Sequence, residues 1–171
     1  GIAGFVGKYL YESLLEIGTD LEIIGMDNLS RSGSESNAKN LHDDGVKLFR
    51  ADIRCQSDID VLPKVDWVID CAANPSVLAG LENSSTSRQL IEHNLLGTIN
   101  MLEYCKRNKA GLILLSTSRV YSASELAVLP MQLSNDRFEL KPSEREDISP
   151  SGITESFPTT APISLYGASK L

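Results

Sequence analysis

Short apolar runs alternate along the chain with longer segments in which apolar residues recur every three or four positions. The short runs are typical of strands, and the longer segments are typical of amphipathic helices. We therefore expect strands at 21–26, 46–50, 65–70 and 111–115, and helices after Gly7, around 37–41, over 86–108 and from 165 onward. Strands that alternate with helices in this way predict an α/β fold with a parallel sheet.

Two of these segments carry further expectations. The density of apolar residues at 65–70 favours a strand that is covered on both faces. Gly97, inside the helix over 86–108, costs about 1 kcal/mol relative to alanine, and close contact with a neighbouring element would offset this cost. Asn94 is expected to make structural hydrogen bonds there. The apolar positions on one face of this helix are Ile91, Leu95, Ile99 and Leu102.

The segment at about 122–164 breaks the alternation. It is rich in proline, and long loops of this kind inside compact domains tend to be functional. Within it, 128–133 and 138–141 are predicted to pair as a hairpin across 134–137. The chain, residues 1–171, has room for one domain with a full core, into which this segment would be inserted.

Composition narrows the class of partner. The net charge of −7 and the pI near 4.8 argue against nucleic acid or an anionic membrane. No apolar run approaches the roughly 20 residues that span a bilayer, and we expect a cytoplasmic protein. Three scattered cysteines (Cys55, Cys71 and Cys105) are too few for a disulfide framework or a zinc site, so we expect buried, reduced thiols and no metal.

Three glycines, Gly1, Gly4 and Gly7, are spaced by three residues and lead into the first helix. Without a Cβ, Gly1 and Gly4 let the backbone approach a pyrophosphate, and Gly7 lets the helix pack tightly on a strand. The helix N-terminus then offers N–H groups to an anion. Alone, the spacing also fits a plain strand–turn–helix junction. The motif begins without a preceding strand, so we expect that the first strand of the sheet is not included.

Asp27 ends the strand at 21–26, about 20 residues after Gly7, where a dinucleotide-binding βαβ unit places the carboxylate that binds the adenosine ribose. Its negative charge repels a 2′-phosphate and favours NAD over NADP, an inference that nearby Arg31 weakens slightly. Asp52 could receive the adenine amino group with Ile53 against the ring, but Asp52 capping the next helical turn is equally consistent with the sequence.

Tyr166 and Lys170 are four positions apart, so on a helix they share one face. The phenol of a free tyrosine, with a pKa of about 10, is a poor base at pH 7, and a neighbouring ammonium favours its phenolate. Thr117, which follows the strand at 111–115, could supply a hydroxyl to a sugar oxygen. The Tyr–Lys pair alone also fits a surface helix, but its place after the glycine turn and Asp27 favours a catalytic role for the pair.

Together the motifs resemble those of the extended short-chain dehydrogenase/reductases that act on nucleotide sugars as epimerases and dehydratases. The matching stretches cover nearly the whole chain: Gly1–Gly7, Asp27–Arg31, Asp52–Ile53, Ala72–Ala73, Asn94–Asn100, Ser116–Tyr121 and Tyr166–Lys170. The resemblance implies a Rossmann-type doubly wound parallel sheet that binds NAD. The cofactor contacts it implies are Gly1, Gly4, Phe5, Val6, Asp27, Asn28, Ser30, Arg31, Asp52, Ile53, Ala72, Ala73, Tyr166 and Lys170.

Within this family the chain is most similar to the CDP-paratose 2-epimerases, also called CDP-tyvelose epimerases, over Asn74–Gly80, Ser87–Asn94 and Leu114–Tyr121. The resemblance implies that a nucleotide-linked sugar is epimerised at C2 through transient oxidation to a keto sugar. Tyr166 would take the hydroxyl proton, Thr117 would orient the sugar oxygen, and Lys170 would hold the nicotinamide ribose.

Other features bear on the substrate. Asn74, Ser118 and Arg119 are implied substrate contacts, with a CDP-sugar favoured. Dehydratases of the family carry an acidic pair directly after the threonine, and Ser118 and Arg119 in those positions argue against dehydration. A UDP-sugar 4-epimerase is the nearest alternative, and a non-catalytic NAD-binding sensor is an alternative of another class.

The resemblance also bears on assembly. It implies a homodimer formed through the helix over 86–108 and the Tyr166 helix, and a C-terminal sugar-binding region that this chain lacks. The apolar face of the helix over 86–108 fits this interface, but packing of that face on the sheet explains it equally well.

Overall fold

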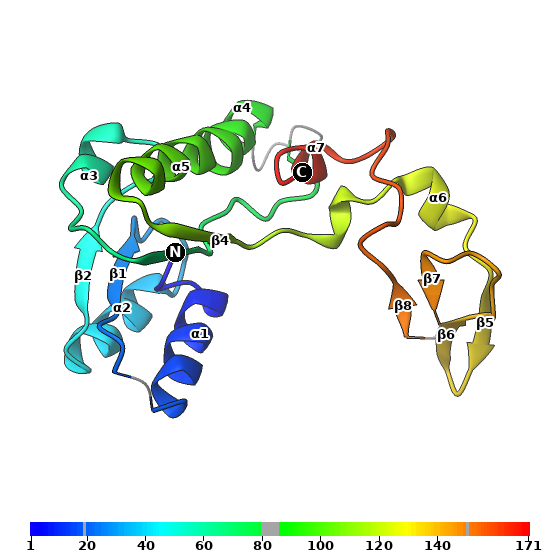
Figure 1. Ribbon diagram of the computed structural model, residues 1–171, viewed down its shortest axis with the longest axis horizontal. Coiled ribbons are helices and arrows are strands. Elements are labelled where there is room, and N and C mark those ends of the chain that lie inside the picture. Colours follow the sequence, from blue (N-terminus) through cyan, green and yellow to red (C-terminus); the bar gives the residue numbers. More distant parts are fainter. Residues whose placement is uncertain (19, 80–85, 150) are drawn as a thin grey trace. The chain divides into compact units, whose positions relative to one another are not determined.

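A computed structural model describes residues 1–18, 20–79, 86–149 and 151–171 (Figure 1). The chain forms two compact units, Gly1–Leu115 and Ser116–Leu171. The sequence indicates a single domain with an inserted segment at about 122–164, whereas the boundary between the compact units lies before that segment. No helix among the described residues has both the length and the apolar character needed to cross a bilayer.

The first unit alternates helices and strands, as the sequence predicts. Its elements are α1 (Phe5–Glu16), β1 (Ile24–Asp27), α2 (Ser34–Asp43), β2 (Lys47–Arg50), α3 (Gln56–Asp60), β3 (Trp67–Asp70), α4 (Ser87–Ile91), a π-helical turn η1 (Glu92–Leu96), α5 (Gly97–Asn108) and β4 (Gly111–Leu114). The strands are shorter than their apolar runs. The helix predicted over 86–108 is present as α4, η1 and α5, with Thr86 as its N-cap.

The strands of this unit pair in parallel, which confirms the predicted type of sheet. β1 pairs with β2, with Ile24 opposite Lys47, and β3 pairs with β4, with Trp67 opposite Gly111. Among the described residues, these two pairs form two separate two-stranded sheets.

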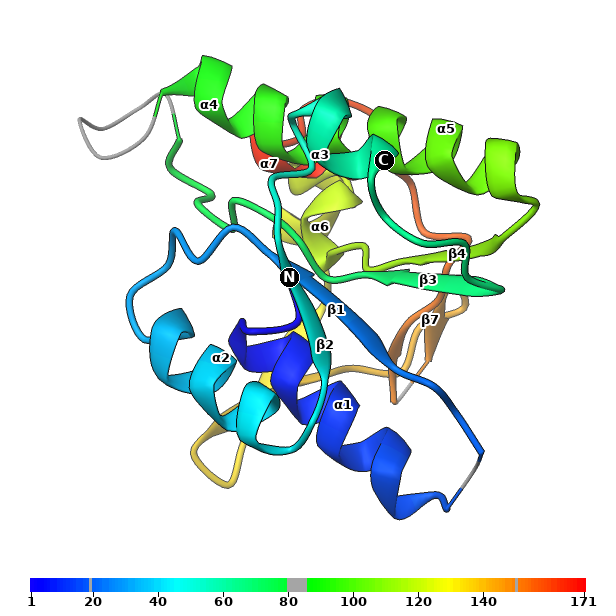
Figure 2. The same ribbon diagram turned by 90° about the vertical axis from the view of Figure 1, so that its left-hand side faces the viewer.

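Helices lie on both sides of the strand layer (Figure 2), with α1 and α2 on one side and α3 and α5 on the other, and each side has its own core. The buried residues of the first core, beside α1 and α2, are Ala3, Tyr11, Ala38, Leu41 and Val46. Those of the second, beside α3 and α5, are Ile53, Ile59, Met101, Tyr104 and Cys105. The second core explains Gly97, because a Cβ there would lie 2.3 Å from Cδ1 of Ile53. The predicted close contact at Gly97 is therefore confirmed.

One expectation about burial is wrong. β3 is not covered on both faces, because Trp67 is 66% exposed and Ile69 is 40% exposed within the described structure. The apolar stripe of η1 and α5 is not packed on the sheet either, since Leu95, Ile99 and Leu102 are all exposed. The side of this helix that enters the core instead carries Leu90, Asn94, Met101 and Tyr104.

The second unit is mostly the segment that the sequence indicates as a loop. Its elements are η2 (Ser118–Val120), α6 (Ala123–Ala127), β5 (Met131–Ser134), β6 (Arg137–Leu140), β7 (Ile148–Ser149), β8 (Gly152–Ile153) and α7 (Leu165–Ala168). β5 and β6 confirm the predicted hairpin. Its turn residues Asn135 and Asp136 have φ of 49° and 62°, as a tight hairpin turn requires. α6 and the β7–β8 pair are too short to leave a periodic pattern.

Arg145 links several segments of this unit to a small aromatic core. Its guanidinium bonds Asp147 through two nitrogens at 2.9 and 2.7 Å and Glu125 through a third at 2.9 Å. The same group lies 5.2 Å from the ring centre of Phe157, which is 1% exposed. Tyr121 packs edge-on against Phe157, with ring centres 5.6 Å apart. The segment at 122–164 is therefore an organised substructure.

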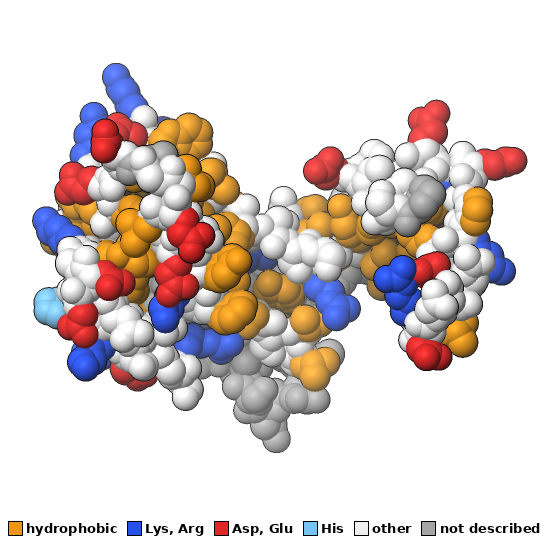
Figure 3. Space-filling model, turned by 90° about the horizontal axis from the view of Figure 1, so that it is seen from below, with side chains coloured by type: hydrophobic (Ala, Val, Ile, Leu, Met, Phe, Trp, Pro, Cys, Tyr) orange, Lys and Arg blue, Asp and Glu red, His pale blue; other side chains and the backbone are white. Residues whose placement is uncertain are grey.

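The cysteines differ in burial. Cys105 is buried and Cys71 is half-buried, but Cys55 is exposed, so the expectation that all three are buried is wrong. None of the three forms a disulfide among the described residues. Among the described residues, no group of His, Cys, Asp or Glu side chains is arranged to hold a metal ion. Acidic and basic side chains are interspersed on the face of the molecule shown in Figure 3.

Candidate cofactor and catalytic sites

The glycine turn before α1 needs glycine at two of its positions. A Cβ on Gly1 would lie 2.8 Å from the backbone nitrogen of Ala72, and a Cβ on Gly7 would lie 2.2 Å from the carbonyl oxygen of Gly1. Gly4 is the N-cap of α1 and offers no side chain to the first turn. The N–H groups of the first turn, which includes Phe5 and Val6, have no partner within the helix. This end of α1 can therefore receive an anion.

Asp27 links the glycine turn to the segment that follows β1 through hydrogen bonds. Its Oδ2 accepts a hydrogen bond from the N–H of Ala3 at 3.0 Å, and its Oδ1 accepts one from the N–H of Leu29 at 2.9 Å. The side chain is buried. Each carboxylate oxygen has a second lone pair, so hydroxyl donors can still be accepted. The position of Asp27 at the end of β1 is as predicted, while its ribose contact stays a prediction.

A polar network joins the ends of β1 and β2. Asn28 donates from Nδ2 to Oδ2 of Asp52 at 2.9 Å. Arg54 donates to both carboxylate oxygens of Asp52, from Nε to Oδ1 at 2.9 Å and from Nη2 to Oδ2 at 2.7 Å. Hydrogen bonds from the Arg54 side chain, followed by that of Asn28, hold the pKa of Asp52 far below its usual range. The sequence gives no sign of Arg54 as the partner.

Asp52 is not the N-cap of α3, which is Cys55. The Oδ1 of Asp52 does accept from the N–H of Arg54 at 2.9 Å, so Asp52 caps the turn that directly precedes this helix. The adenine contact of Asp52 stays a prediction. Ile53 is buried in the second core and packs under Gly97, so its side chain is directed mainly into the protein. Its carbonyl oxygen accepts a hydrogen bond from Nδ2 of Asn100 at 2.8 Å.

Asn94 holds the segment that follows β3. Its Oδ1 accepts from the N–H of Asn74 at 2.8 Å, and its Nδ2 donates to the carbonyl oxygen of Asn74 at 3.1 Å. Asn94 is fully buried and lies in the π-helical turn η1, a feature often found at functional sites. This confirms Asn94 as a structural hydrogen-bonding residue. Ala72 and Ala73 are half-buried, and Gly80, at the end of the predicted motif, lies outside the described residues.

The remaining predicted cofactor residues follow β1. The N–H of Ser30 donates to Oδ1 of Asn28 at 3.0 Å, and Arg31 accepts from the hydroxyl of Ser34 through its carbonyl oxygen at 2.6 Å. The Arg31 residue is exposed. Apart from Tyr166 and Lys170, which belong to the second unit, the predicted dinucleotide residues lie after the carboxyl ends of β1, β2 and β3 and at the N-terminus of α1. This is the edge where open α/β sheets bind ligands.

The second unit carries the predicted catalytic residues on two elements that pack together. Thr117 is the N-cap of η2, where its hydroxyl accepts from the N–H of Arg119 at 3.2 Å. Tyr166 is the second residue of the short helix α7. The N-cap of this helix is Ser164, whose hydroxyl accepts from the N–H of Gly167 at 3.0 Å. A Cβ on Gly167 would lie 2.0 Å from the carbonyl oxygen of Arg119. The glycine lets α7 sit directly on the turn that follows Thr117.

Lys170 lies in the turn after α7, rather than inside a helix as the sequence predicts, because the helix ends at Ala168. Lys170 is 6% exposed, whereas Tyr166 is half-buried. The carbonyl oxygen of Lys170 accepts from the hydroxyl of Ser116 at 3.3 Å, which ties this turn to the segment before Thr117. Both predicted substrate contacts on η2, at 118 and 119, are exposed.

Curated relatives are similar to most of this chain. UDP-glucuronic acid decarboxylase 1 of Arabidopsis thaliana is 32% identical over 123 residues, which are 71% of this chain and 26% of the relative. UDP-glucose 4-epimerase of Pisum sativum is 31% identical over 135 residues, which are 73% of this chain and 37% of the relative. The chain thus spans only part of the length of these relatives.

Solved structures share the fold along nearly the whole chain. UDP-glucose 4-epimerase of Thermus thermophilus, solved in complex with NAD, has a TM-score of 0.66 and 28% identity, over 99% of this chain and 45% of that one. The fold is therefore of the Rossmann-like α/β type, as the sequence predicts. The model of the NAD dependent epimerase/dehydratase family matches residues 1–171. This chain belongs to the NAD-dependent epimerase/dehydratase family.

Proposed function

We propose that this chain is the NAD-binding and catalytic part of a nucleotide-sugar epimerase that works through transient oxidation, with CDP-paratose as its substrate and C2 as the carbon that inverts. The observation that carries the proposal is the packing of α7, which bears Tyr166, on the turn capped by Thr117. This packing brings the two elements that bear a phenol and a hydroxyl into contact within one compact unit. A protein that only sensed NAD would gain nothing from it.

The residues of the first unit fit NAD, on which the family depends. Glycine at positions 1 and 7 lets the turn pack closely on neighbouring backbone, which fixes the N-terminus of α1 at the place where a pyrophosphate would bind. The uncapped first turn of α1 offers N–H groups to the phosphates. Asp27 offers a carboxylate to the ribose hydroxyls. When bound, NAD accepts a hydride from the sugar carbon and later returns it.

The chain's own residues would handle the proton and the orientation of the sugar. The Tyr166 phenolate removes the proton of the sugar hydroxyl, so that a ketone forms at that carbon. The Thr117 hydroxyl hydrogen-bonds the same oxygen and fixes its distance from the phenol. The Lys170 ammonium favours the phenolate and binds ribose hydroxyls. After the keto sugar turns over and its carbonyl is reduced on the other face, Tyr166 returns the proton to the same sugar oxygen, which becomes a hydroxyl of the opposite configuration.

Transient oxidation also explains why no acidic residue is needed beside Thr117. An unactivated C–H bond of a sugar is far too weak an acid for direct removal of its proton, so inversion requires a carbonyl intermediate. Elimination of water would need a carboxylate next to the reacting carbon. The exposed Ser118 and Arg119 offer hydrogen bonds instead, and suit contacts to substrate hydroxyls or phosphate.

A UDP-sugar 4-epimerase is the second candidate. It is favoured by the similarity to UDP-glucose 4-epimerase of Pisum sativum and to that of Thermus thermophilus. The glycine turn, Asp27 and the Thr117–Tyr166–Lys170 set serve oxidation at either carbon. The distinction between the two candidates therefore depends on the sugar and the base.

We also propose a homodimer formed through α5 and η1. Leu95, Ile99 and Leu102 leave an apolar stripe exposed along this helix. Contiguous exposed apolar surface of this kind is typical of association sites.

The experiment that tests the function uses the full-length protein that carries this sequence. CDP-paratose labelled with deuterium at C2 should yield CDP-tyvelose without added NAD and with the label retained at C2. Tyr166→Phe should lower kcat by about 100-fold or more with bound NAD unchanged, whereas Tyr9→Phe, on an exposed part of α1, should leave kcat unchanged. Conversion of UDP-glucose instead would establish the 4-epimerase. Bound NAD without turnover of either sugar would refute an epimerase.

A further inference from the structure

Asp27 and Asp52 lie at the carboxyl ends of the paired strands β1 and β2, but they differ in the acceptor sites that remain on their carboxylates. An ionised carboxylate has about four such sites, two on each oxygen. Asp27 uses one site on each oxygen, for the N–H groups of Ala3 and Leu29. One site therefore remains on each oxygen of Asp27, which suits the adjacent hydroxyls of a ribose.

All the acceptor sites of Asp52 are occupied. Its Oδ1 accepts from the backbone N–H and from Nε of Arg54, both at 2.9 Å. Its Oδ2 accepts from Nη2 of Arg54 at 2.7 Å and from Nδ2 of Asn28 at 2.9 Å. These four bonds fill both oxygens, so an amino group that approached Asp52 would have to displace one of the present donors.

Arg54, in contrast, keeps groups that a ligand can reach. Its Nη1 makes no hydrogen bond within the described part of the chain, and its side chain is 33% exposed. The pKa of Arg54 is raised chiefly by its hydrogen bonds to Asp52, and Glu92 on η1 adds a weaker attraction. The guanidinium is therefore charged, and its two bonds to Asp52 fix its orientation. A planar guanidinium stacks on aromatic rings and can donate to ring nitrogens.

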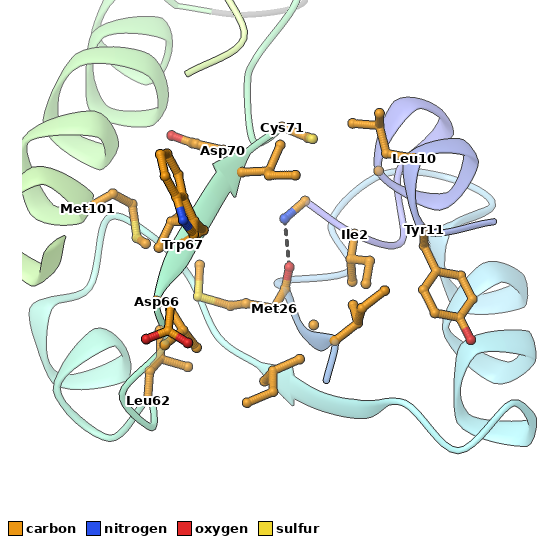
Figure 4. Close-up of a pocket in the computed structure, with 18 of the residues that line it drawn as sticks. Ile2, Leu10, Tyr11, Met26, Leu62, Asp66, Trp67, Asp70, Cys71 and Met101 are labelled. Carbon is orange, nitrogen blue, oxygen red and sulfur yellow. Dashed lines mark hydrogen bonds between the residues drawn. The ribbon is translucent and has the colours of Figure 1, made fainter. Parts of the chain in front are cut away.

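Ile53, which separates these two residues in the sequence, is directed away from this edge of the sheet. It is 7% exposed, and its Cδ1 lies where a Cβ on Gly97 would be 2.3 Å away. It also lines the mainly apolar cavity of about 520 Å³ between β1 and β3 (Figure 4). A base that lay at this edge would therefore meet Arg54 rather than the side chain of Ile53.

The base of a bound dinucleotide would reach the Asp52–Arg54 pair. The proposed function puts the pyrophosphate at the N-terminus of α1 and the ribose at Asp27, at the end of β1. The strand that pairs with β1 is β2, and Asn28, directly after Asp27, is bonded to Asp52. The base is attached to the ribose at the end opposite to the pyrophosphate, so we expect it over the Asp52–Arg54 pair.

We propose that the purine of NAD packs against the guanidinium of Arg54, and that Asp52 positions Arg54 instead of accepting from the amino group of the base. This replaces the adenine contact that the sequence suggests for Asp52. Every purine offers a ring face and N7, so contact with a guanidinium does not depend on the substituent at C6. The site then accepts deamino-NAD, the hypoxanthine analogue, as readily as NAD. The proposal rests on the NAD binding that the proposed function includes.

The test measures the dissociation constants of NAD and deamino-NAD by calorimetry, on the full-length protein that carries this sequence, stripped of nucleotide. The two constants should agree within about 3-fold, because no acceptor site of Asp52 is left to select the amino group. In Arg54→Met, deamino-NAD should bind about 10-fold more weakly, because the contact with the guanidinium is lost. NAD should lose no more than about 3-fold, because its amino group can donate to the freed oxygens of Asp52.

Arg107→Met is the matched control, since Arg107 also bonds an aspartate, Asp60, but in an exposed pair between α5 and α3. It should leave both constants unchanged. The comparison in the parent needs no substitution, so it stays decisive if Arg54→Met does not fold. A preference of the parent for NAD above about 3-fold would overturn the proposal and leave the proposed function intact. So would unchanged binding of both dinucleotides in Arg54→Met. Binding of neither dinucleotide to the parent would overturn the NAD binding on which both proposals rest.

Discussion

The backbone of Gly167 meets the carbonyl of Arg119 so closely that a Cβ on the glycine would lie 2.0 Å from that oxygen. The partner atom is backbone, which cannot rotate away as the end of a side chain can. Gly167→Ala should therefore push α7 away from the turn that Thr117 caps. Because catalytic groups must be held within a fraction of an ångström, we expect kcat of the full-length enzyme to fall by about 100-fold.

The control for this change is Ala168→Gly, one residue along α7 at an exposed position. It alters the same helix without approaching η2, and its effect on kcat should be small. The amount of bound NAD and the thermal midpoint, measured alongside kcat, show whether a fall in kcat comes from a displaced Tyr166 or from loss of the folded state. If Gly167→Ala kept the kcat of the parent enzyme, contact between α7 and η2 would not be what positions Tyr166.

Asn94 connects η1 to the backbone of Asn74 through both ends of its amide. Asn94→Asp keeps the shape but replaces the donor toward the Asn74 carbonyl with a carboxylate oxygen. A buried carbonyl that loses its partner costs about 1–3 kcal/mol, so the free energy of unfolding should fall by that amount in urea titrations. NAD affinity, measured by calorimetry, should also weaken, because the segment that follows β3 is released.

Asn108→Asp is the matched control. Asn108 also donates from Nδ2 to a backbone carbonyl, that of Tyr104 at 3.0 Å, but it lies at the end of α5 and is half-buried. We expect a smaller loss of stability and no change in NAD affinity. Equal effects of the two substitutions on NAD affinity would contradict a specific role of Asn94 in holding the cofactor segment.

The ion pair of Asp52 and Arg54 should make stability depend on pH in the acid range. The Arg54 side chain lowers the pKa of Asp52 in the folded protein, so the stabilisation is fully present above the unfolded pKa of about 3.9. It is lost as the pH falls below that value toward the folded pKa. In Arg54→Met, the unfolding free energy at pH 6 should be lower by about 1 kcal/mol.

Comparison of the two proteins at about pH 6 and about pH 2.5 isolates this contribution. The difference in unfolding free energy between parent and Arg54→Met should shrink at the lower pH, because Asp52 is then largely protonated in the unfolded chain, while Arg54 keeps it ionised in the folded parent. A difference that stayed constant between the two pH values would show that Arg54 stabilises through packing of its side chain rather than through the charge of Asp52.

These residues also show which features can be predicted from sequence. The glycine turn and Asp27 are predictable because their signals are local: a positional need for glycine and a carboxylate at the end of one strand. Arg54 as the partner of Asp52, and the burial of Ile53 under Gly97, depend on how separate elements pack. An amphipathic stripe does not by itself reveal what covers it, which is why the pattern leaves open whether Leu95 meets the sheet or a partner.

The segment at 122–164 gives the last prediction. Its sequence pattern predicts the β5–β6 hairpin but not α6 or the β7–β8 pair, and its organising residue, Arg145, bonds Glu125 and Asp147 while covering Phe157. A single exposed ion pair contributes little, but a network that also covers a buried ring contributes more. Arg145→Met should lower the thermal midpoint by about 2–4 °C and speed hydrogen exchange around Phe157.

Arg137→Met is the control for this change, since Arg137 makes one ion pair, with Glu139 on the exposed hairpin. Its loss should shift the thermal midpoint by no more than about 1 °C. The pKa of Asp147 is lowered mainly by its hydrogen bonds to Arg145, so the stabilisation from Arg145 should be present at neutral pH and diminish below about pH 4. Equal losses in Arg145→Met and Arg137→Met would mean that Phe157 alone organises the segment. Hydrogen exchange at Tyr121 would then be unchanged by either substitution, whereas we expect it to quicken in Arg145→Met alone, because that ring packs against Phe157.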